Sequence, residues 1–225
     1  FESGGNKATH RMLEKKWSFY DGPLYRFEGT EEIDGNFRIY ASSCNTYKHV
    51  VGIRAHDHSA TQHLHDHQRP NALSTINVVT TSDNAIILGW RKSGDWDESY
   101  ELSGGFIRTH EPSLLQSTLR RLNDDLSIHR SEIIHHSLLS VVHYPHIFET
   151  MGVFNIHISL TAKELTARTH RYPQLIHVPT TKDHWETIKK RSDIMLHPPS
   201  QMVLDMVLNM RCQNMSSHYT PLCAH

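Results

Sequence analysis

The chain has 225 residues, with 23 Lys plus Arg against 24 Asp plus Glu and a net charge of −1. At about 150 residues per domain, this length predicts one decorated domain and excludes a long array of repeats. The even charge balance argues against the basic surface that binds a phosphate backbone, so the sequence has no direct nucleic-acid signature. Its apolar runs fall short of the roughly 18 residues that span a bilayer, and we expect no transmembrane segment.

The cysteines are few and show no C-x-x-C spacing: Cys44, Cys212 and Cys223. An odd count suits free thiols in a reducing compartment better than a disulfide framework. We therefore expect an intracellular protein, in the cytoplasm or, if its N-terminus is processed, in an organelle such as the mitochondrion. The first residue is Phe1 rather than Met, which leaves the reason for that start open.

Composition along the chain predicts its organisation. We expect a flexible polar arm at 1–16, an N-terminal β extension with a histidine-rich connector at 17–69, a core domain at 70–211 and a tail at 212–225. Strands are expected at 24–27 and 37–40, because Asp34-Gly35 between them is a favourable hairpin turn. The β-branched stretches 73–80 and 85–90 predict an antiparallel hairpin in the central sheet.

A helix is predicted at 113–126. Its leucines recur at steps of four, three and four residues, which places them on one helical face: Leu115, Leu119, Leu122 and Leu126. Pro112 fits the first turn, where its missing N–H costs nothing.

Beyond this helix the period returns to two at 133–144 and 151–160, which predicts two strands. Thr161 and Glu164 match a capping box that opens a short helix to Arg168. A strand at 175–178 and a helix at 181–191 follow. Ser200 is expected to cap a C-terminal helix with an apolar stripe of Met202, Val203, Met206, Val207 and Met210.

A glycine pair stands between the central hairpin and the first long helix. Gly104-Gly105 ends a strand and Gly105-x5-Glu111 follows. After eight intervening residues, where the box quoted next has seven, comes the run from Arg120 to Ile128. This pattern resembles the Nudix box, G-x5-E-x7-R-E-U-x-E-E-x-G-U with U apolar. The run departs from the box at four places: Arg121 stands for the family's essential Glu, Asp124 and Asp125 for its paired Glu residues, and Ser127 for its late Gly.

The resemblance implies an α/β fold, namely a Nudix-type α/β/α sandwich with a mixed sheet and an N-terminal β extension. From about Trp17 to Met210 the chain is most similar to the UDP-sugar diphosphatase branch, through fragments such as 20–26, 47–49, 88–93 and 159–161. The resemblance implies catalytic roles for Glu111, Arg120, Arg121, Asp124 and Asp125. It implies Mg²⁺ on Asp124 and Asp125, and substrate contacts from Tyr47, Lys48, Arg54, Arg91, Gly104 and Gly105.

The departure at Arg121 bears on activity. Pyrophosphate hydrolysis needs divalent ions held by carboxylates, and Arg121 lies three and four positions before Asp124 and Asp125, within reach of both. A guanidinium there would take the place of the metal, although a solvated charged helix face is the alternative interpretation. We expect a catalytically impaired protein that binds a nucleotide or nucleotide sugar, or that serves as a subunit of a larger assembly. The alternative is an active Mg-dependent UDP-sugar hydrolase.

The 20 histidines offer further candidates. Those of the connector are His56, His58, His63, His65 and His67. If the connector is helical, His63 and His67 share a face at a spacing that suits zinc or nickel; a solvated, compositionally biased connector is the alternative. His135, His136, His143 and His146 follow the helix and could replace a lost general base, but ordinary strand and loop positions are the favoured interpretation.

Overall fold

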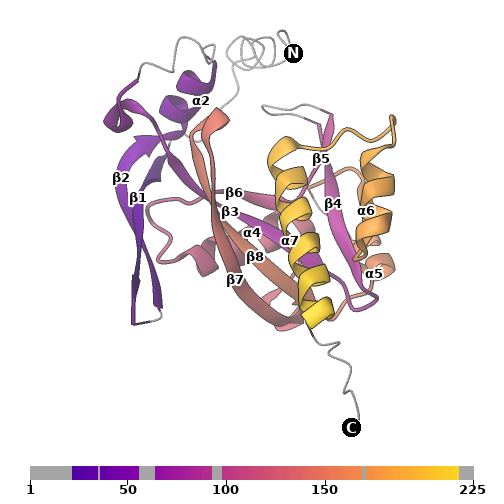
Figure 1. Ribbon diagram of the computed structural model, residues 1–225. Coiled ribbons are helices and arrows are strands. Elements are labelled where there is room, and N and C mark those ends of the chain that lie inside the picture. Colours follow the sequence, from indigo (N-terminus) through magenta and orange to yellow (C-terminus); the bar gives the residue numbers. More distant parts are fainter. Residues whose placement is uncertain (1–21, 35, 56–63, 93–97, 169–170, 218–225) are drawn as a thin grey trace.

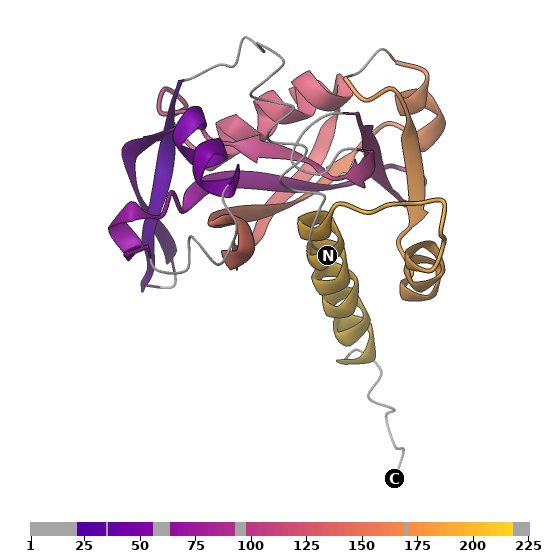
Figure 2. The same ribbon diagram turned by 90° about the horizontal axis from the view of Figure 1, so that it is seen from above.

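The computed structural model describes residues 22–34, 36–55, 64–92, 98–168 and 171–217. Their nine strands form one mixed sheet with helices on both faces, so the predicted α/β class is confirmed. Figure 2 shows the sheet edge-on, with helix α4 (Leu114–Leu126) on one side and helix α7 (Pro198–Ser217) on the other. Among the described residues, no helix is both long and apolar enough to cross a membrane.

The N-terminal extension is an antiparallel hairpin. Strands β1 (Pro23–Ile33) and β2 (Asn36–Thr46) are longer than the predicted 24–27 and 37–40, and Asp34 has a φ of 52° at the expected turn. Helix α2 (Tyr47–Ala55) and a 3-10 turn, η1 (Asp66–Gln68), follow. The predicted arm at 1–16 lies outside the described residues, as do Trp17 and most of the connector.

The central hairpin is only partly as predicted. Strands β3 (Ala72–Thr80) and β4 (Ala85–Arg91) form, but they pair only beside their turn, at Thr80 and Ile86. They then diverge because each takes other partners. Strand β3 pairs with β6 (Ser103–Phe106) and, in parallel, with β8 (Glu149–Ile158), while β4 pairs with β5 (Ser99–Glu101) and β9 (Leu175–Pro179).

Helix α4 begins one residue later than predicted. The Ser113 side chain caps it by accepting the Gln116 N–H at 3.2 Å, so the prediction that Pro112 lies in the first turn was wrong. The buried face carries Leu122 and Leu126 and also three polar residues, Ser117, Thr118 and Asp125. This face is therefore rotated from the predicted leucine stripe, and Leu119 is only half-buried.

The remaining strands follow the predicted order. Strand β7 (Ile133–Tyr144) pairs with β8 on the edge of β8 that does not face β3. In the sequence β7 is preceded by the short 3-10 turn η2 (Arg130–Glu132) and followed by η3 (Pro145–Ile147). The capping box of Thr161 and Glu164 is confirmed, and it opens α5 (Ala162–Thr166). Helix α6 (Lys182–Lys189) lies within the predicted 181–191.

Helix α7 begins at Pro198, so the prediction that Ser200 caps it was wrong. Ser200 lies in the first turn, where its Oγ accepts the Leu102 N–H at 3.0 Å. Among the hydrophobic residues of α7 whose burial is described, Val203, Leu204, Val207 and Leu208 are fully buried, whereas the predicted Met210 is 39% exposed. The two larger clusters of the described core lie on opposite faces of the sheet, one under α6 and α7 and the other under α4 and α5. A small third cluster joins Leu24, Val50 and Ala72 of the N-terminal part.

Candidate functional site

A cavity of about 180 Å³ lies where the glycine pair of β6, helix α4 and the start of α7 meet. Five of the predicted site residues line it, namely Tyr47, Arg91, Gly104, Gly105 and Arg121. Several residues that the sequence did not single out also line it, among them Thr75, Glu101, Phe106, Glu149, Arg171 and His197. Ser200, which was expected only as a helix cap, lines it too.

Both glycines of the pair are required by close approaches. A Cβ on Gly104 would collide with the carbonyl oxygen of Thr75 on the neighbouring strand β3. Gly105 has a φ of 148°, which side chains rarely adopt, and a Cβ there would lie 2.5 Å from a terminal nitrogen of Arg121. The Arg121 guanidinium therefore packs directly against the backbone of β6 at Gly105.

Arg121 is a largely buried cation whose N–H donors lack acceptors among the described residues. Its Nε is buried without an acceptor, and the side chain forms no hydrogen bond or ion pair with any described residue. Burial lowers the pKa of Arg121, while the charge of Asp125 opposes this change. Because a guanidinium stays ionised in proteins even so, a positive charge lines the cavity without a bound acceptor.

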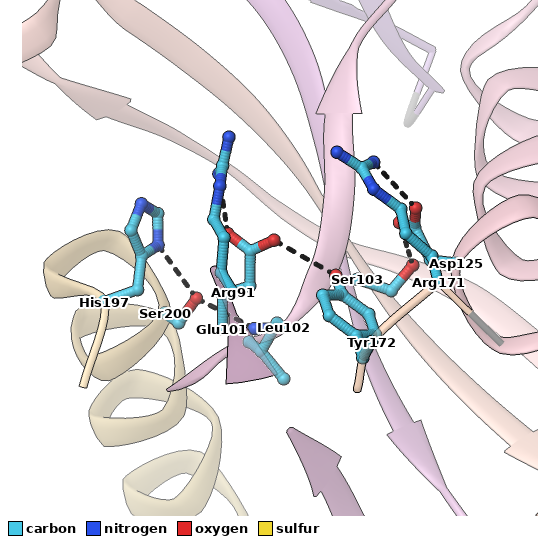
Figure 3. Close-up of polar contacts among 9 residues, drawn as sticks. All are labelled: Arg91, Glu101, Leu102, Ser103, Asp125, Arg171, Tyr172, His197 and Ser200. Carbon is cyan, nitrogen blue, oxygen red and sulfur yellow. Dashed lines mark hydrogen bonds and ion pairs between the residues drawn. The ribbon is translucent and has the colours of Figure 1, made fainter. Parts of the chain in front are cut away.

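Asp125 is buried and fully engaged. Its carboxylate accepts the Ser103 hydroxyl at 3.0 Å and the Arg171 guanidinium at 3.2 Å (Figure 3). The Arg171 N–H also donates to the Asp125 carbonyl at 3.2 Å. Burial raises the pKa of Asp125, and the charges of Arg121 and Arg171 counter part of this effect.

Asp124 lies apart from Asp125. Its carboxylate is 47% exposed and accepts Arg120 at 3.2 Å. Arg120 also pairs with Glu111, which accepts the Arg108 N–H at 2.8 Å. Burial opposes ionisation of Glu111, but the hydrogen bond and charge of Arg120, together with the Arg108 N–H and Ser117, outweigh it and lower the pKa of Glu111. The two parts of the box therefore meet through Arg120 and Glu111, while the two aspartates face different partners.

The residues present do not fit the magnesium site that the sequence resemblance implies. Over the described ranges, no three His, Cys, Asp or Glu side chains gather closely enough to hold a metal ion. Asp125 already bonds Ser103 and Arg171, so an ion would have to displace both. The sequence had placed Asp124 within reach of Arg121, but in the structure Asp124 is bonded by Arg120.

A second series of hydrogen-bonded side chains, centred on Glu101, lies beside the one centred on Asp125. Glu101 accepts Arg91 at 2.8 Å through one carboxylate oxygen and the Tyr172 hydroxyl at 3.1 Å through the other (Figure 3). Burial, aided by the charge of Glu101, holds the pKa of Tyr172 well above its ordinary value. The neighbours Arg171 and Tyr172 thus fix Asp125 and Glu101, two acidic residues from different elements.

The residues at the start of α7 line another part of the cavity. His197 Nδ1 lies 3.1 Å from the Ser200 Oγ, which also accepts the Leu102 N–H (Figure 3). This arrangement ties the helix to the β5–β6 junction. Sequence reasoning placed neither residue at the site, because Pro198-Pro199 signals a helix start but not which strand the helix packs against.

Other predicted site residues lie elsewhere. Lys48 is exposed and does not line the cavity, and the Arg54 side chain is outside the described part of α2. His63 is likewise outside the described residues, while His67 is exposed in η1, its ring centroid 5.7 Å from that of His65. The histidines of 133–147 do not line the cavity; His197 does.

Comparison with known proteins finds similarities of structure only. Neither a family model nor a curated protein matches the sequence. The NUDIX domain of Shewanella oneidensis NrtR, complexed with ADP ribose, is 14% identical with a TM-score of 0.48, over 69% of this chain and 99% of that one. A mutT/nudix family protein from Listeria innocua is 14% identical with a TM-score of 0.48, over 64% and 96%.

A third likeness is to a bifunctional NMN adenylyltransferase/ADP ribose pyrophosphatase from Francisella tularensis. It is 16% identical with a TM-score of 0.49, over 73% of this chain and 46% of that one. All three likenesses concern the arrangement of the chain alone.

Proposed function

We propose that this protein binds the phosphate of a nucleotide-type ligand through Arg121 and is impaired in Mg-dependent hydrolysis. The observation that carries the proposal is the enclosed Arg121 guanidinium, which lines the cavity without an acceptor among the described residues. The charge of Asp125 offsets only part of the effect of burial on the pKa of Arg121. Burying a charge without a bonded partner costs several kcal/mol, so such a side chain signals an anionic partner. A phosphate offers the paired oxygens that a guanidinium binds best.

The support for a phosphate comes from Arg121 itself, since Glu101 and Glu149 also line the cavity. Arg171 forms an ion pair with Asp125, and Arg91 forms one with Glu101. In each pair the positive charge is matched by a carboxylate. The charge of Arg121 is not matched by such a bond. The missing side chain of Gly105 is what lets the Arg121 guanidinium lie against the backbone of β6 at the cavity. The nucleotide or nucleotide-sugar class rests on the sequence resemblance to UDP-sugar diphosphatases.

Impaired hydrolysis is supported by the state of the acidic residues. Hydrolysis of a pyrophosphate by this route needs metal ions to neutralise and orient the reacting oxygens. Here Asp125 bonds Ser103 and Arg171, and Asp124 bonds Arg120 on an exposed surface. A cation at Arg121 further repels an incoming divalent ion. The protein would then act as a ligand-binding pseudoenzyme, alone or as a subunit of a larger assembly.

Calorimetry with UMP and UDP-glucose in EDTA and in Mg²⁺ tests the binding. We expect binding without metal, weakened about 10- to 100-fold in Arg121→Gln, because a charged hydrogen bond is worth about 1.5–3 kcal/mol. Arg191→Gln is the matched control, since Arg191 is an exposed arginine paired with Asp193 on the surface. Binding that requires Mg²⁺, or that Arg121→Gln leaves intact, would refute the proposal.

Turnover assays separate the alternative hydrolase. Efficient Mg-dependent cleavage of UDP-sugars by the unmutated protein, abolished by Asp124→Asn or Asp125→Asn, would establish an active enzyme. In the impaired protein we expect no such cleavage, and Arg121→Glu should create measurable metal binding. Absence of both ligand binding and turnover in every variant would favour a purely structural role in an assembly.

A further inference from the structure

Strand β3 and helix α4 enclose polar atoms that have no partner among the described residues. Thr75 and Asn77 of β3 are 1% and 0% exposed, and neither the Thr75 hydroxyl nor the Asn77 amide nitrogen forms a hydrogen bond. The Nε of Arg121 on α4 is a further such atom. The amide oxygen of Asn77 is engaged, because it accepts the Thr118 hydroxyl at 3.2 Å. Buried polar atoms without partners are rare in folded proteins, so a group of donors at one interface indicates a missing partner.

Thr75 and Arg121 meet at Gly105. Gly105 is the direct antiparallel partner of Thr75, so a Cβ on Gly105 would lie on the same face of the sheet as the Thr75 side chain. That Cβ would be 2.8 Å from the Arg121 Nε. Because opposed side chains start about 4.5–5.5 Å apart, one small ion or molecule can contact both the Thr75 hydroxyl and the Arg121 Nε. Asn77 lies two residues further along β3, on the same face.

The missing partner has to accept hydrogen bonds. The Arg121 Nε and the Asn77 amide nitrogen carry only hydrogens and cannot accept, whereas the Thr75 hydroxyl can rotate to donate. A water molecule between them would bring two hydrogens of its own into a group made mainly of donors. An anion accepts from every side and also offsets the charge of Arg121.

The charges around Arg121 favour an anion as well. Burial lowers the pKa of Arg121, the charge of Asp125 opposes this, and the positive charges of Arg120, Arg171 and Arg108 lower the pKa again. Asp125 is itself paired with Arg171. A local excess of positive charge raises the concentration of anions at such a place.

We propose that the protein binds a monatomic anion, a halide such as chloride, between the Arg121 Nε and the Thr75 hydroxyl. A spherical ion suits two single donors that approach from a helix and a strand, whereas an oxyanion is bound best by paired N–H groups. The residue that stands where the resemblance has an essential Glu thus serves an anion. This site goes beyond the nucleotide binding proposed above and does not depend on it.

Halide titrations of the full protein test the site. Sodium chloride or sodium bromide replaces sodium gluconate at constant ionic strength, so that general screening does not change. The melting temperature should rise with halide concentration and level off, because an ion that binds only the folded state stabilises it. Crystals grown in sodium bromide should show anomalous scattering from an ion between Thr75 and Arg121.

Substitutions locate the ion. Thr75→Val removes the hydroxyl and should weaken bromide binding about 10- to 100-fold, and Arg121→Gln should do the same, because each removes a hydrogen bond to a charged group. In gluconate alone, Thr75→Val should raise the melting temperature, since the variant no longer buries an unpartnered hydroxyl.

Thr150→Val is the matched control. Thr150 is also 1% exposed and lies on the neighbouring strand β8, but its hydroxyl is 3.1 Å from the His143 Nδ1 and it does not line the cavity. This variant should lose stability equally in gluconate and in bromide. It should keep the bromide response of the unmutated protein.

Each outcome decides. Equal melting temperatures in gluconate and bromide, or bromide found only elsewhere in the crystals, would overturn the anion site. If Thr75→Val lowers stability equally in every salt, the hydroxyl binds water and the proposal is also wrong. Bromide binding without UMP binding would support this site and refute the proposed function, and UMP binding through Arg121 without a halide response would do the reverse. If Arg121→Gln fails to fold, Thr75→Val and the unmutated protein still give the answer.

Discussion

The Arg121 guanidinium lies on the backbone of Gly105, so that a Cβ there would come within 2.5 Å of a terminal nitrogen. We predict that Gly105→Ala weakens binding of a phosphate ligand, because the methyl group displaces the end of Arg121. It should also lower the free energy of unfolding by about 1–3 kcal/mol, since the φ of 148° strains any L side chain. Calorimetry and chemical denaturation measure the two effects.

Gly29→Ala is the matched control for this substitution. Gly29 has a similar φ, 157°, but nothing lies within 4 Å of a Cβ placed on it. The control should lose stability to a similar extent and keep its ligand affinity. Equal loss of affinity in both variants would show that strain, and not the position of Arg121, governs binding.

Leu122→Ala should destabilise the protein strongly. Leu122 is fully buried between α4 and the sheet, and truncating such a side chain leaves a cavity. The expected loss is about 2–5 kcal/mol in the free energy of unfolding by urea titration. Met195→Ala, at a side chain that is 61% exposed, should change stability little. A small loss at Leu122 would contradict the packing of α4.

The ion pair of Glu132 with Arg168 gives a pH-dependent prediction. The Arg168 hydrogen bonds lower the pKa of Glu132 from 4.5 to about 2. The carboxylate therefore adds stability that is complete above pH 4.5 and disappears as the pH falls towards 2. Glu132→Gln should cost about 1 kcal/mol at pH 7, because the pair is partly exposed. The difference from the unmutated protein should shrink on acidification, and a constant difference from pH 7 to pH 3 would contradict this.

The histidine-rich connector should be dispensable for folding. His65 and His67 are exposed, which agrees with a solvated segment. Replacing His56, His58, His63, His65 and His67 with Gln should leave the melting temperature unchanged, with or without zinc. A large loss seen only in the presence of zinc would show that the connector binds metal.

The sequence predicts the elements of this fold better than their pairing. The period of two at 133–144 and the capping box of Thr161 are local signals, and both are confirmed. The separation of β3 from β4 is decided by partners far along the chain, such as Glu149 opposite Ala72. Leu119 illustrates the same limit, because the buried face of α4 is set by polar contacts such as that of Thr118 with Asn77.

The candidate site shows the corresponding limit. Gly104, Gly105 and Arg121 were found because they stand in a motif of fixed spacing, and all three line one cavity. Arg171 and Tyr172 were missed, since nothing near them in the sequence reveals that they bond Asp125 and Glu101. His197 and Ser200 come from the far end of the chain and are brought to the cavity only by the packing of α7.

Strand β3 also has a consequence for how the chain is made. All nine of its residues are buried, and one of its edges is covered along its whole length by the parallel strand β8. During synthesis that edge has no native partner until residues 149–157 leave the ribosome. Such long-range pairing is slow, and an uncovered apolar strand invites association with other chains. Nascent chains that stop before β8 should therefore be the form that aggregates, and the form that depends most on chaperones.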